Sequence, residues 1–283
     1  MIPVAFDYVR PGSVDEAVAA LVAGGEDAKV MAGGQSLMPV LRLRLGAPSV
    51  VVDCSRIDEL RGIREEGDVI VIGAGATHHA VMNDPLVVQH LGLLAKATAT
   101  VADPQIRHRG TFGGSMAHAD PAGDQAAAAV ALDATFTIAG PQGRRQVGAP
   151  EFFVDYFTTA VGPDEILVDV RMPKKTGWGS HYEKLNRTAQ AWAIVGAAAT
   201  VRMEGGRIAE ARVGLTNVAP SPVRAKAVEA ALVGASDAAA IAAAAQAAAE
   251  GTNPTSDQHA DAAYRQHLAR VLTKRAVQQA AGL

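Results

Sequence analysis

Short apolar runs alternate with stretches of helical spacing over the first half of the chain. Ser13 and Glu16 form a capping box in front of an amphipathic pattern over 14–24, which predicts a helix that ends at Gly24-Gly25. Apolar runs predict strands at 28–31, 49–53 and 68–74. Helical spacing predicts helices at 36–45, where Pro39 disturbs the pattern, at 85–101 and at 124–134. A hairpin is predicted over 135–149, around Pro141-Gln142-Gly143.

The second half begins with a change of composition near 171–180, which indicates a boundary. Apolar runs at 193–203 and 207–218, joined by Glu204-Gly205-Gly206, predict two antiparallel strands. Helical patterns then dominate, at 221–234, 237–251 and 263–280. Mixed strands and helices, followed by an antiparallel sheet with helices, predict an α+β protein of two lobes.

The composition excludes several classes of protein. The 283 residues are enough for a large buried core, and 49% of them are hydrophobic, mainly alanine and valine. The formal net charge of −3 offers no basic surface for nucleic acid. No run of about 18 uncharged apolar residues predicts a membrane span, and residues 1–13 lack the pattern of a signal peptide. We therefore expect a cytoplasmic protein.

The cysteine and histidine content predicts no metal site. Cys54 is the single cysteine, so an internal disulfide and a cysteine-ligated iron–sulfur cluster or structural zinc are excluded for this chain. It closes an apolar run and is expected to be a small buried residue. The histidines without metal-ligand spacing, which are expected on exposed loops, are His78, His79, His108 and His118.

Two Gly-Gly stretches carry the candidate chemistry. They are MAGGQSLMPVLRLRL at 31–45 and RGTFGGSMAHADPAGD at 109–124, each with a hydroxyl beside the glycines and a helical pattern after them. Backbone N–H groups of a glycine loop approach a phosphate closely because no Cβ intervenes, and a following helix adds free N–H groups and its dipole. Two such loops predict a grip on both phosphates of a dinucleotide. Neither matches the P-loop of nucleoside triphosphatases.

The segment VIVIGAGATHHA at 69–80 places G-x-G after a strand, as a Rossmann fingerprint does. His78 stands where the third glycine belongs and no long helix is predicted there, so a tight turn at the end of the strand is the preferred interpretation. The chain also lacks the G-x-S-x-G elbow of hydrolases. Arg42 and Arg44 are interpreted as a solvated face, with contact to a partner protein as the alternative.

Four stretches carry a resemblance along essentially the whole chain: KVMAGGQSLMP, ADPQIRHRGTFGGSMAHADPAGD, DEILVDVRMP and YEKLNR. Together they resemble the flavin subunits of molybdenum hydroxylases, and most nearly the medium subunits of aerobic carbon monoxide dehydrogenases. The resemblance implies an FAD-binding domain of the vanillyl-alcohol-oxidase (PCMH) type at 1–176, in subdomains of about 1–54 and 55–176. It further implies the C-terminal domain of carbon monoxide dehydrogenase flavoproteins at 177–283.

The resemblance also implies partners and a path for electrons. A large subunit would hold molybdopterin and oxidise the substrate, and a small subunit would hold two [2Fe–2S] clusters. FAD in this chain would pass the electrons to a quinone or another acceptor. The implied assembly is a dimer of heterotrimers in the cytoplasm, with the inner face of the membrane as an alternative location. No catalytic residue beyond the flavin is expected here, because the protein supplies position and electrostatics to the cofactor.

Carried over to this sequence, the resemblance implies a set of cofactor-binding residues. The loop from Lys29 to Leu37 would wrap the diphosphate together with the second loop, and Asp124 would lie near the nucleotide part. Ile166, Leu167 and Lys184 would lie near the flavin, where the charge of the lysine would favour reduced, anionic forms. Trp192 would cover the isoalloxazine. Two departures from the family pattern are Ser115, where asparagine is common, and Gln190-Ala191, where Gly-Asp is usual. The full set is Lys29, Val30, Met31, Ala32, Gly33, Gly34, Gln35, Ser36, Leu37, Val101, Gly110, Thr111, Gly114, Ser115, Ala117, Gly123, Asp124, Ile166, Leu167, Lys184 and Trp192.

The alternatives left open concern the substrate and the independence of the chain. The substrate of the whole complex is carbon monoxide, an N-heterocycle of the nicotine or quinoline type, or an aldehyde, because a different chain selects it. A free-standing flavin oxidase would need its own substrate pocket, and only 4% of the residues are aromatic. A scaffold that has lost its cofactor is disfavoured by the intact glycine loops.

Overall fold

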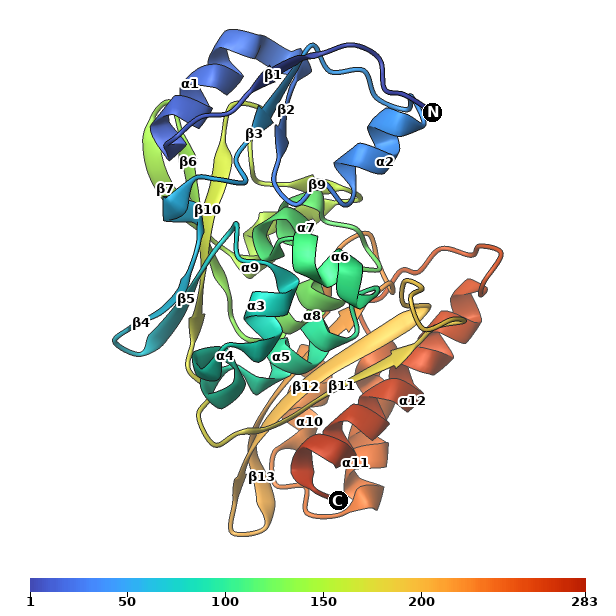
Figure 1. Cartoon of the computed structure of the whole chain (residues 1–283). Helices are drawn as coiled ribbons and strands as arrows, with labels where there is room; N and C mark the ends of the chain where they lie inside the picture. The colour runs from blue at the N-terminus through green and yellow to red at the C-terminus, as the bar shows by residue number, and fades with distance from the viewer.

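The computed structural model describes residues 1–283 as three packed parts (Figure 1). A small parallel sheet with its helices forms the N-terminal part. A five-stranded antiparallel sheet with short helices forms the middle part, and a four-stranded antiparallel sheet with three helices forms the C-terminal part. The class is α+β, which confirms the prediction from the sequence. None of the helices combines the length and the apolar character that crossing a membrane requires.

The N-terminal part is a sheet in the order β1-β3-β2, and both strand pairs are parallel. Its elements are β1 (Asp7–Val9), α1 (Val14–Gly24), β2 (Ala28–Met31), α2 (Leu37–Arg42) and β3 (Val50–Asp53), with 3₁₀ turns at Gly25–Asp27 and Asp58–Leu60. Helix α1 begins as predicted, because the Ser13 hydroxyl accepts a hydrogen bond from the Glu16 amide. Its buried face packs into a cluster that includes Cys54, which is 3% exposed as expected.

The middle part is built on a sheet in the order β4-β5-β10-β6-β7 in which every pair is antiparallel. Its strands are β4 (Ile63–Glu66), β5 (Val69–Gly73), β6 (Thr135–Gly140), β7 (Gly143–Gly148) and β10 (Ile166–Pro173). Strands β6 and β7 form the predicted hairpin. A separate two-stranded ribbon consists of β8 (Phe153–Asp155) and β9 (Thr158–Thr159). The central strand β10 is mostly buried, and its first residues lie at the site described below.

The middle part contains seven short helices. They are α3 (His78–Asn83), α4 (Pro85–His90), α5 (Gly92–Ala99), α6 (Pro104–Arg109), α7 (Phe112–His118), α8 (Asp124–Ala131) and α9 (Ala149–Phe152).

The single helix predicted over 85–101 is two helices in the structure, α4 and α5. The chain leaves helical geometry at Leu91, which is fully buried and has φ −130° and ψ 43°. Gly92 follows, and glycine costs about 1 kcal/mol in a helix interior relative to alanine. Burial of the leucine therefore prevails over the weak helical pattern at this point.

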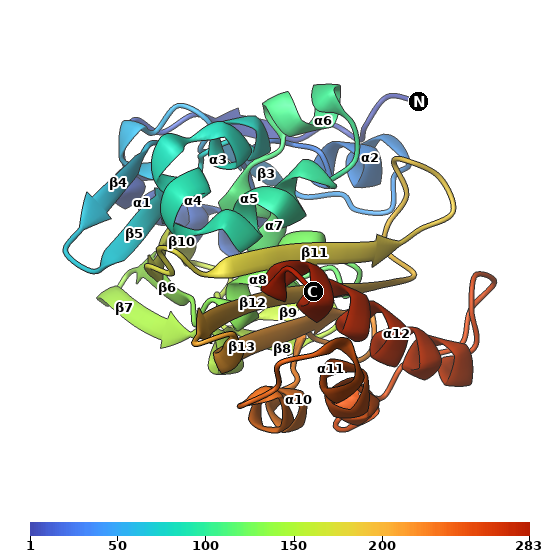
Figure 2. The same ribbon diagram turned by 90° about the horizontal axis from the view of Figure 1, so that it is seen from below.

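The C-terminal part is an antiparallel sheet in the order β11-β12-β13-β14, with its helices on one face (Figure 2). The strands are β11 (Gly179–Leu185), β12 (Val195–Glu204), β13 (Arg207–Thr216) and β14 (Val223–Arg224), and the helices are α10 (Lys226–Leu232), α11 (Ala238–Ala244) and α12 (Ala262–Ala281). The helix predicted over 237–251 ends at Ala244 and continues as a 3₁₀ helix over Ala245–Ala249. Such tightening is common at the end of an α-helix.

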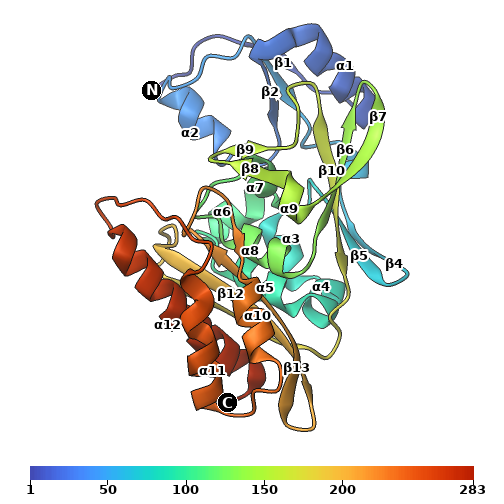
Figure 3. The same ribbon diagram turned by 180° about the vertical axis from the view of Figure 1, so that it is seen from behind.

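Helix α8 lies between the middle and the C-terminal parts (Figure 3). All of its residues are buried, because it packs on α5 and on strands β12 and β13. Gly214 of β13 approaches it so closely that a Cβ there would overlap the carbonyl oxygen of Ala127. The helix ends at Ala131 rather than at residue 134, since the chain turns at Asp133 with φ +54°. Its alanines let it fit between the C-terminal sheet and the helices of the middle part, and its first residue, Asp124, reaches the site.

Candidate functional site

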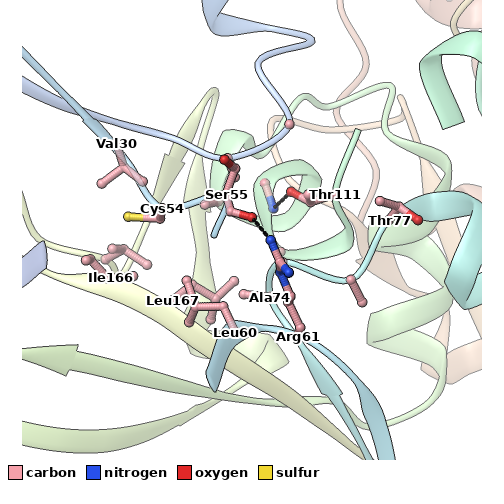
Figure 4. A pocket seen from close by; sticks show the side chains of 18 of the residues that line it. Val30, Cys54, Ser55, Leu60, Arg61, Ala74, Thr77, Thr111, Ile166 and Leu167 are labelled. Carbon is pink, nitrogen blue, oxygen red and sulfur yellow. Dashed lines mark hydrogen bonds between the residues drawn. The ribbon is translucent and has the colours of Figure 1, made fainter. Parts of the chain in front are cut away.

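Two cavities meet where the two Gly-Gly stretches face each other. The first has a volume of about 560 Å³, is lined by the first glycine loop, α6, α7 and the segment between β11 and β12, and is called the Lys184 cavity. The second, of about 830 Å³, lies between the N-terminal and middle parts and is called the Leu167 cavity (Figure 4). The residues that line both cavities are Lys29, Val30, Ala32, Gly33, Thr111, Gly114 and Ala117.

The first glycine loop presents a row of unpaired backbone donors. Strand β2 ends at Met31, and the chain then turns through Gly34, whose φ is +73°. None of the backbone N–H groups from residue 32 to residue 37 donates a hydrogen bond within the protein, although these residues are half-buried. The Gln35 side chain steadies the loop by donating to the Gly33 carbonyl at 3.0 Å. Successive unpaired amides of this kind form an anion-binding nest.

The glycines of the two stretches serve different purposes. A Cβ on Gly33 would overlap the backbone of the second stretch, and a Cβ on Gly113 would overlap the chain just after β5, so both permit close packing of backbones. Gly34 supplies the positive φ of the first loop. Gly114 faces both cavities, and a Cβ there would lie 2.7 Å from the hydroxyl oxygen of Thr111.

The second Gly-Gly stretch is the first turn of helix α7 and not an open loop, which corrects the expectation of two equivalent loops. The Thr111 hydroxyl caps the helix by accepting a hydrogen bond from the Gly114 amide at 3.2 Å. The Phe112 and Gly113 amides donate to carbonyl oxygens of the chain that follows β5. Because the protein itself uses these amides, the stretch offers a ligand mainly the Ser115 side chain and the open surface of Gly114.

A buried ion pair forms one wall of the Lys184 cavity. The Lys184 ammonium lies 2.8 Å from a carboxylate oxygen of Asp124, and the side chains are 6% and 3% exposed. The Tyr182 hydroxyl donates to the other carboxylate oxygen at 2.6 Å. Burial raises the pKa of Asp124, and burial next to this carboxylate raises the pKa of Tyr182 well above its usual range. Asp124 balances the charge of Lys184, so the expected effect of the lysine charge on reduced, anionic flavin is offset by the carboxylate.

Trp192 lies at the Lys184 cavity on the segment between β11 and β12. The residue is 56% exposed, and Gln190 and Ala191 line the cavity beside it. An indole at the edge of a cavity can cover a flat ligand ring on one face. The expected role of Trp192 over the isoalloxazine stays a prediction.

The structure separates the residues that were expected beside the flavin. Ile166 and Leu167 begin strand β10 and line the Leu167 cavity (Figure 4), whereas Lys184 lies in the other cavity. Asp124, expected near the nucleotide part, is paired with Lys184 and therefore lies at the same end of the site. The other expected residues that line the Lys184 cavity alone are Met31, Gly34, Gln35, Ser36, Leu37, Val101, Gly110, Ser115, Gly123 and Trp192.

Sequence reasoning missed several residues of the two cavities. His78 is 5% exposed and lines the Lys184 cavity, which corrects its expected place on an exposed loop. The threonine before it, Thr77, is the N-cap of α3, and this was the available signal that His78 opens a helix. In the Leu167 cavity, Arg61 donates to the Ser55 carbonyl at 2.6 Å (Figure 4). Phe157 adopts φ +50° there, which no local pattern predicts.

The chemistry of the two cavities suits binding of an elongated anion. No group of three or more His, Cys, Asp or Glu side chains comes together as a metal site. Burial raises the pKa of the Cys54 thiol in the Leu167 cavity to about 12, so the residue is not a thiolate nucleophile. What remains is a central nest of amides, with the buried ion pair of Asp124 and Lys184 at one cavity and Ile166 and Leu167 at the other.

Known proteins match the chain along its whole length. Residues 4–175 match the FAD binding domain in molybdopterin dehydrogenase, and residues 180–280 match the CO dehydrogenase flavoprotein C-terminal domain. The chain therefore belongs to the FAD-binding subunits of the molybdopterin dehydrogenases and is a component of an oxidoreductase.

Individual relatives cover nearly all of the chain. The carbon monoxide dehydrogenase medium chain of Hydrogenophaga pseudoflava is 43% identical over 284 residues, which are 99% of this chain and 98% of the relative. The structure of CO dehydrogenase from Oligotropha carboxidovorans covers 100% of this chain and 99% of its own, with a TM-score of 0.96 and 41% identity. The structure of quinoline 2-oxidoreductase from Pseudomonas putida 86 covers 100% of this chain and 99% of its own, with a TM-score of 0.95 and 36% identity. These findings confirm the family and the fold expected from the sequence.

Proposed function

We propose that the chain holds FAD across the two cavities, with the diphosphate on the amides of residues 32–37. This row of unpaired donors carries the proposal. A donor withdrawn from water without an acceptor costs about 1–3 kcal/mol, and a diphosphate would satisfy several of them at once. The cavities on either side, about 560 and 830 Å³, leave room for the two halves of a dinucleotide.

The difference between the two cavities supports a proposed place for each half of the cofactor. The isoalloxazine is proposed to lie in the Lys184 cavity, where Trp192 is available to cover it. The adenosine half is proposed to lie in the Leu167 cavity against Ile166 and Leu167. The separation of these two residues from Lys184 supports this assignment and revises the expectation that all three contact the flavin.

The proposed role is electron transfer. Bound FAD supplies the exchange of one or two electrons, and the residues of this chain bind and orient it. The amides hold the diphosphate, while the ion pair of Asp124 and Lys184 provides a polar wall without net charge. Electrons are proposed to come from [2Fe–2S] clusters of a small subunit and to leave to a quinone or another acceptor. A cytoplasmic location, or one at the inner face of the membrane, belongs to the same proposal.

The proposed complex is an aerobic carbon monoxide dehydrogenase. The 43% identity with the medium chain of that enzyme favours it. The second candidate is a complex that oxidises an N-heterocycle, which the similarity to quinoline 2-oxidoreductase supports. In either case a large molybdopterin subunit completes the complex as a dimer of heterotrimers.

The proposed domain division is an FAD-binding domain at 1–176 with subdomains of about 1–54 and 55–176, and a C-terminal domain at 177–283. Three separate hydrophobic clusters support it. The N-terminal cluster also takes Ile166 and Val168 from β10, so the two subdomains share an apolar contact. Placing the Leu167 cavity between two subdomains is consistent with a vanillyl-alcohol-oxidase type of cofactor site.

A comparison of FAD with FMN tests the proposed span of the cofactor. FMN lacks the adenosine half, so it would fill the Lys184 cavity and leave the Leu167 cavity empty. We expect the purified chain to bind FAD at least roughly 100-fold more tightly than FMN, measured by quenching of flavin fluorescence. ADP is expected to compete with FAD. Equal affinity for FAD and FMN, without competition by ADP, would contradict the assignment of the Leu167 cavity.

A further inference from the structure

We infer that His78 is an additional cofactor-binding residue, whose imidazole donates a hydrogen bond to the segment between the diphosphate and the flavin ring. The inference rests on the proposed function. His78 is the first residue of α3, and its backbone amide donates to the Gly110 carbonyl at 2.9 Å. This bond ties α3 to the start of the second glycine stretch.

Gly110 packs against one edge of the His78 imidazole. A Cβ on Gly110 would lie 2.8 Å from both Cδ2 and Nε2 of His78, so this edge of the ring faces Gly110. Both residues line the Lys184 cavity. Glycine is needed for this close packing, and because Nε2, unlike Nδ1, is not fully buried, a ligand in the cavity can approach it.

The protein leaves the imidazole without a hydrogen-bond partner. Nδ1 is completely buried and unpaired, and no protein group bonds to Nε2. Burial, reinforced by the nearby Arg107 guanidinium, lowers the pKa of His78 to about 4, so the ring is neutral at pH 7. A neutral imidazole carries one N–H, either on Nδ1 or on Nε2. Placing it on the fully buried Nδ1, where no acceptor is available, is the costlier of the two arrangements. The N–H is therefore expected on Nε2, the nitrogen that is not fully buried.

The position of His78 selects the part of the ligand that it meets. His78 lines the Lys184 cavity but not the Leu167 cavity, whereas Thr111, just after Gly110, lines both. The imidazole thus lies beside the diphosphate site on the side of the flavin. The oxygens in that stretch of FAD are the ribityl hydroxyls and the adjoining phosphate, and each can accept a hydrogen bond from a neutral donor.

The test compares four variants of the whole chain by their dissociation constants for FAD and by the thermal midpoints of the apo forms. His78→Leu and His78→Phe remove the donor, while His78→Gln keeps an N–H group. His79→Gln is the matched control, because His79 is exposed and stacks on His108 at 3.9 Å between ring centroids. We expect the Leu and Phe variants to bind FAD roughly 5- to 30-fold more weakly. The Gln variant and the control are expected to stay within about threefold of the parent chain.

The outcomes separate this inference from the proposed function. If the parent chain binds FAD and the Phe and Gln variants bind it equally well, His78 only packs under Gly110 and the inference is wrong. This comparison decides the matter even if the Leu variant does not fold. If the parent chain itself binds no FAD, the proposed function fails and the inference fails with it.

Discussion

Lys184 and Asp124 form an ion pair across 60 residues of sequence, with 2.8 Å between Nζ and Oδ2. The lysine belongs to β11 of the C-terminal sheet and the aspartate to α8, so the pair fastens these two elements while it lines the cavity. Both side chains are almost fully buried. If one residue of the pair were replaced by an apolar residue, the other would remain as an uncompensated buried charge.

The first prediction concerns the stability of this pair. Lys184→Met is expected to lower the free energy of unfolding by about 3–5 kcal/mol, because it strands the buried Asp124. The double variant Lys184→Met with Asp124→Asn should recover part of that loss. Arg202→Met is the control, since Arg202 pairs with Glu204 at an exposed site, and it should cost under about 1 kcal/mol. Urea unfolding of the apo chain measures all three, and equal losses for Lys184 and Arg202 would count against a buried pair.

The second prediction concerns the backbone of the first glycine loop. Gly34→Val should abolish FAD binding, because a branched side chain strains a residue at φ +73° and displaces the unpaired amides around it. Gly205→Val carries the same kind of strain at φ +55° in the turn between β12 and β13, far from the glycine loops. That control should lose stability and keep FAD. Retention of stoichiometric flavin by the Gly34 variant would show that the nest is not the diphosphate site.

The third prediction concerns Trp192. Trp192→Ala is expected to keep FAD bound, because the loss of stacking is only about 0.5–1.5 kcal/mol, and to change the rate at which reduced flavin reacts with oxygen. Trp178→Ala is a matched control, since Trp178 packs under the Lys175 ammonium at 4.7 Å and lines neither cavity. Stopped-flow reoxidation compares the two variants. Unchanged reoxidation with a lower thermal midpoint would mean that Trp192 only supports packing.

The fourth prediction is a pH dependence of apo stability due to His78. The pKa of His78 is lowered to about 4 in the folded chain, against an ordinary value of 6.5. Between these values the unfolded chain binds the extra proton, so stability falls as the pH falls from about 6.5 to 4, by about 3 kcal/mol in total. Below about pH 4 the loss is complete. The His78→Gln variant should lack this loss of stability at low pH. Parallel curves of unfolding free energy against pH for the parent chain and the variant would disprove the prediction.

The fifth prediction separates substrate oxidation from electron delivery. In the proposed complex, the large and small subunits without this chain should still oxidise substrate and reduce the iron–sulfur clusters, because this chain is proposed to act only after the clusters, through its FAD. Transfer to the proposed quinone acceptor should stop. Rapid-mixing spectra of the complex with and without the chain measure both steps. Loss of cluster reduction on removal of the chain would contradict the division of labour.

Local sequence patterns were sufficient to predict the elements whose start and end signals lie within a few residues of the element itself. The capping box of Ser13 and Glu16, the hairpin at Pro141-Gln142-Gly143 and the long helix α12 all appear where the sequence predicts them. The break at Leu91 was not predictable, because it depends on which core the side chain enters. The short helices of the middle part gain their stability from packing rather than from propensity, so their ends follow tertiary contacts.

The candidate site was predictable in part of its residues but not in its arrangement. All residues that the resemblance supplied line at least one of the two cavities, since motifs fix residue types along the chain, but most of the lining of the Leu167 cavity was not among them. The resemblance gave no distances, so it did not show that Asp124 and Lys184 neutralise each other or that Leu167 lies in a different cavity from Lys184. Likewise, the two glycine stretches look alike in sequence. Only the hydrogen bonds of the structure show that amides of the second stretch already donate to oxygen atoms of the protein.

Helix α8 has a consequence for how this chain can be divided. The alanines of α8 belong to the core of the middle part, and β13 lies against the opposite side of the same helix. Neither lobe is therefore a free-standing module, because removal of the C-terminal lobe would expose the alanines of α8 and leave the buried Asp124 without its partner. Proteolytic nicking at the exposed residues 176–177 should yield two fragments that stay associated and keep the pairing of Asp124 with Lys184. Exchange of the C-terminal lobe between relatives would succeed only with the matching α8.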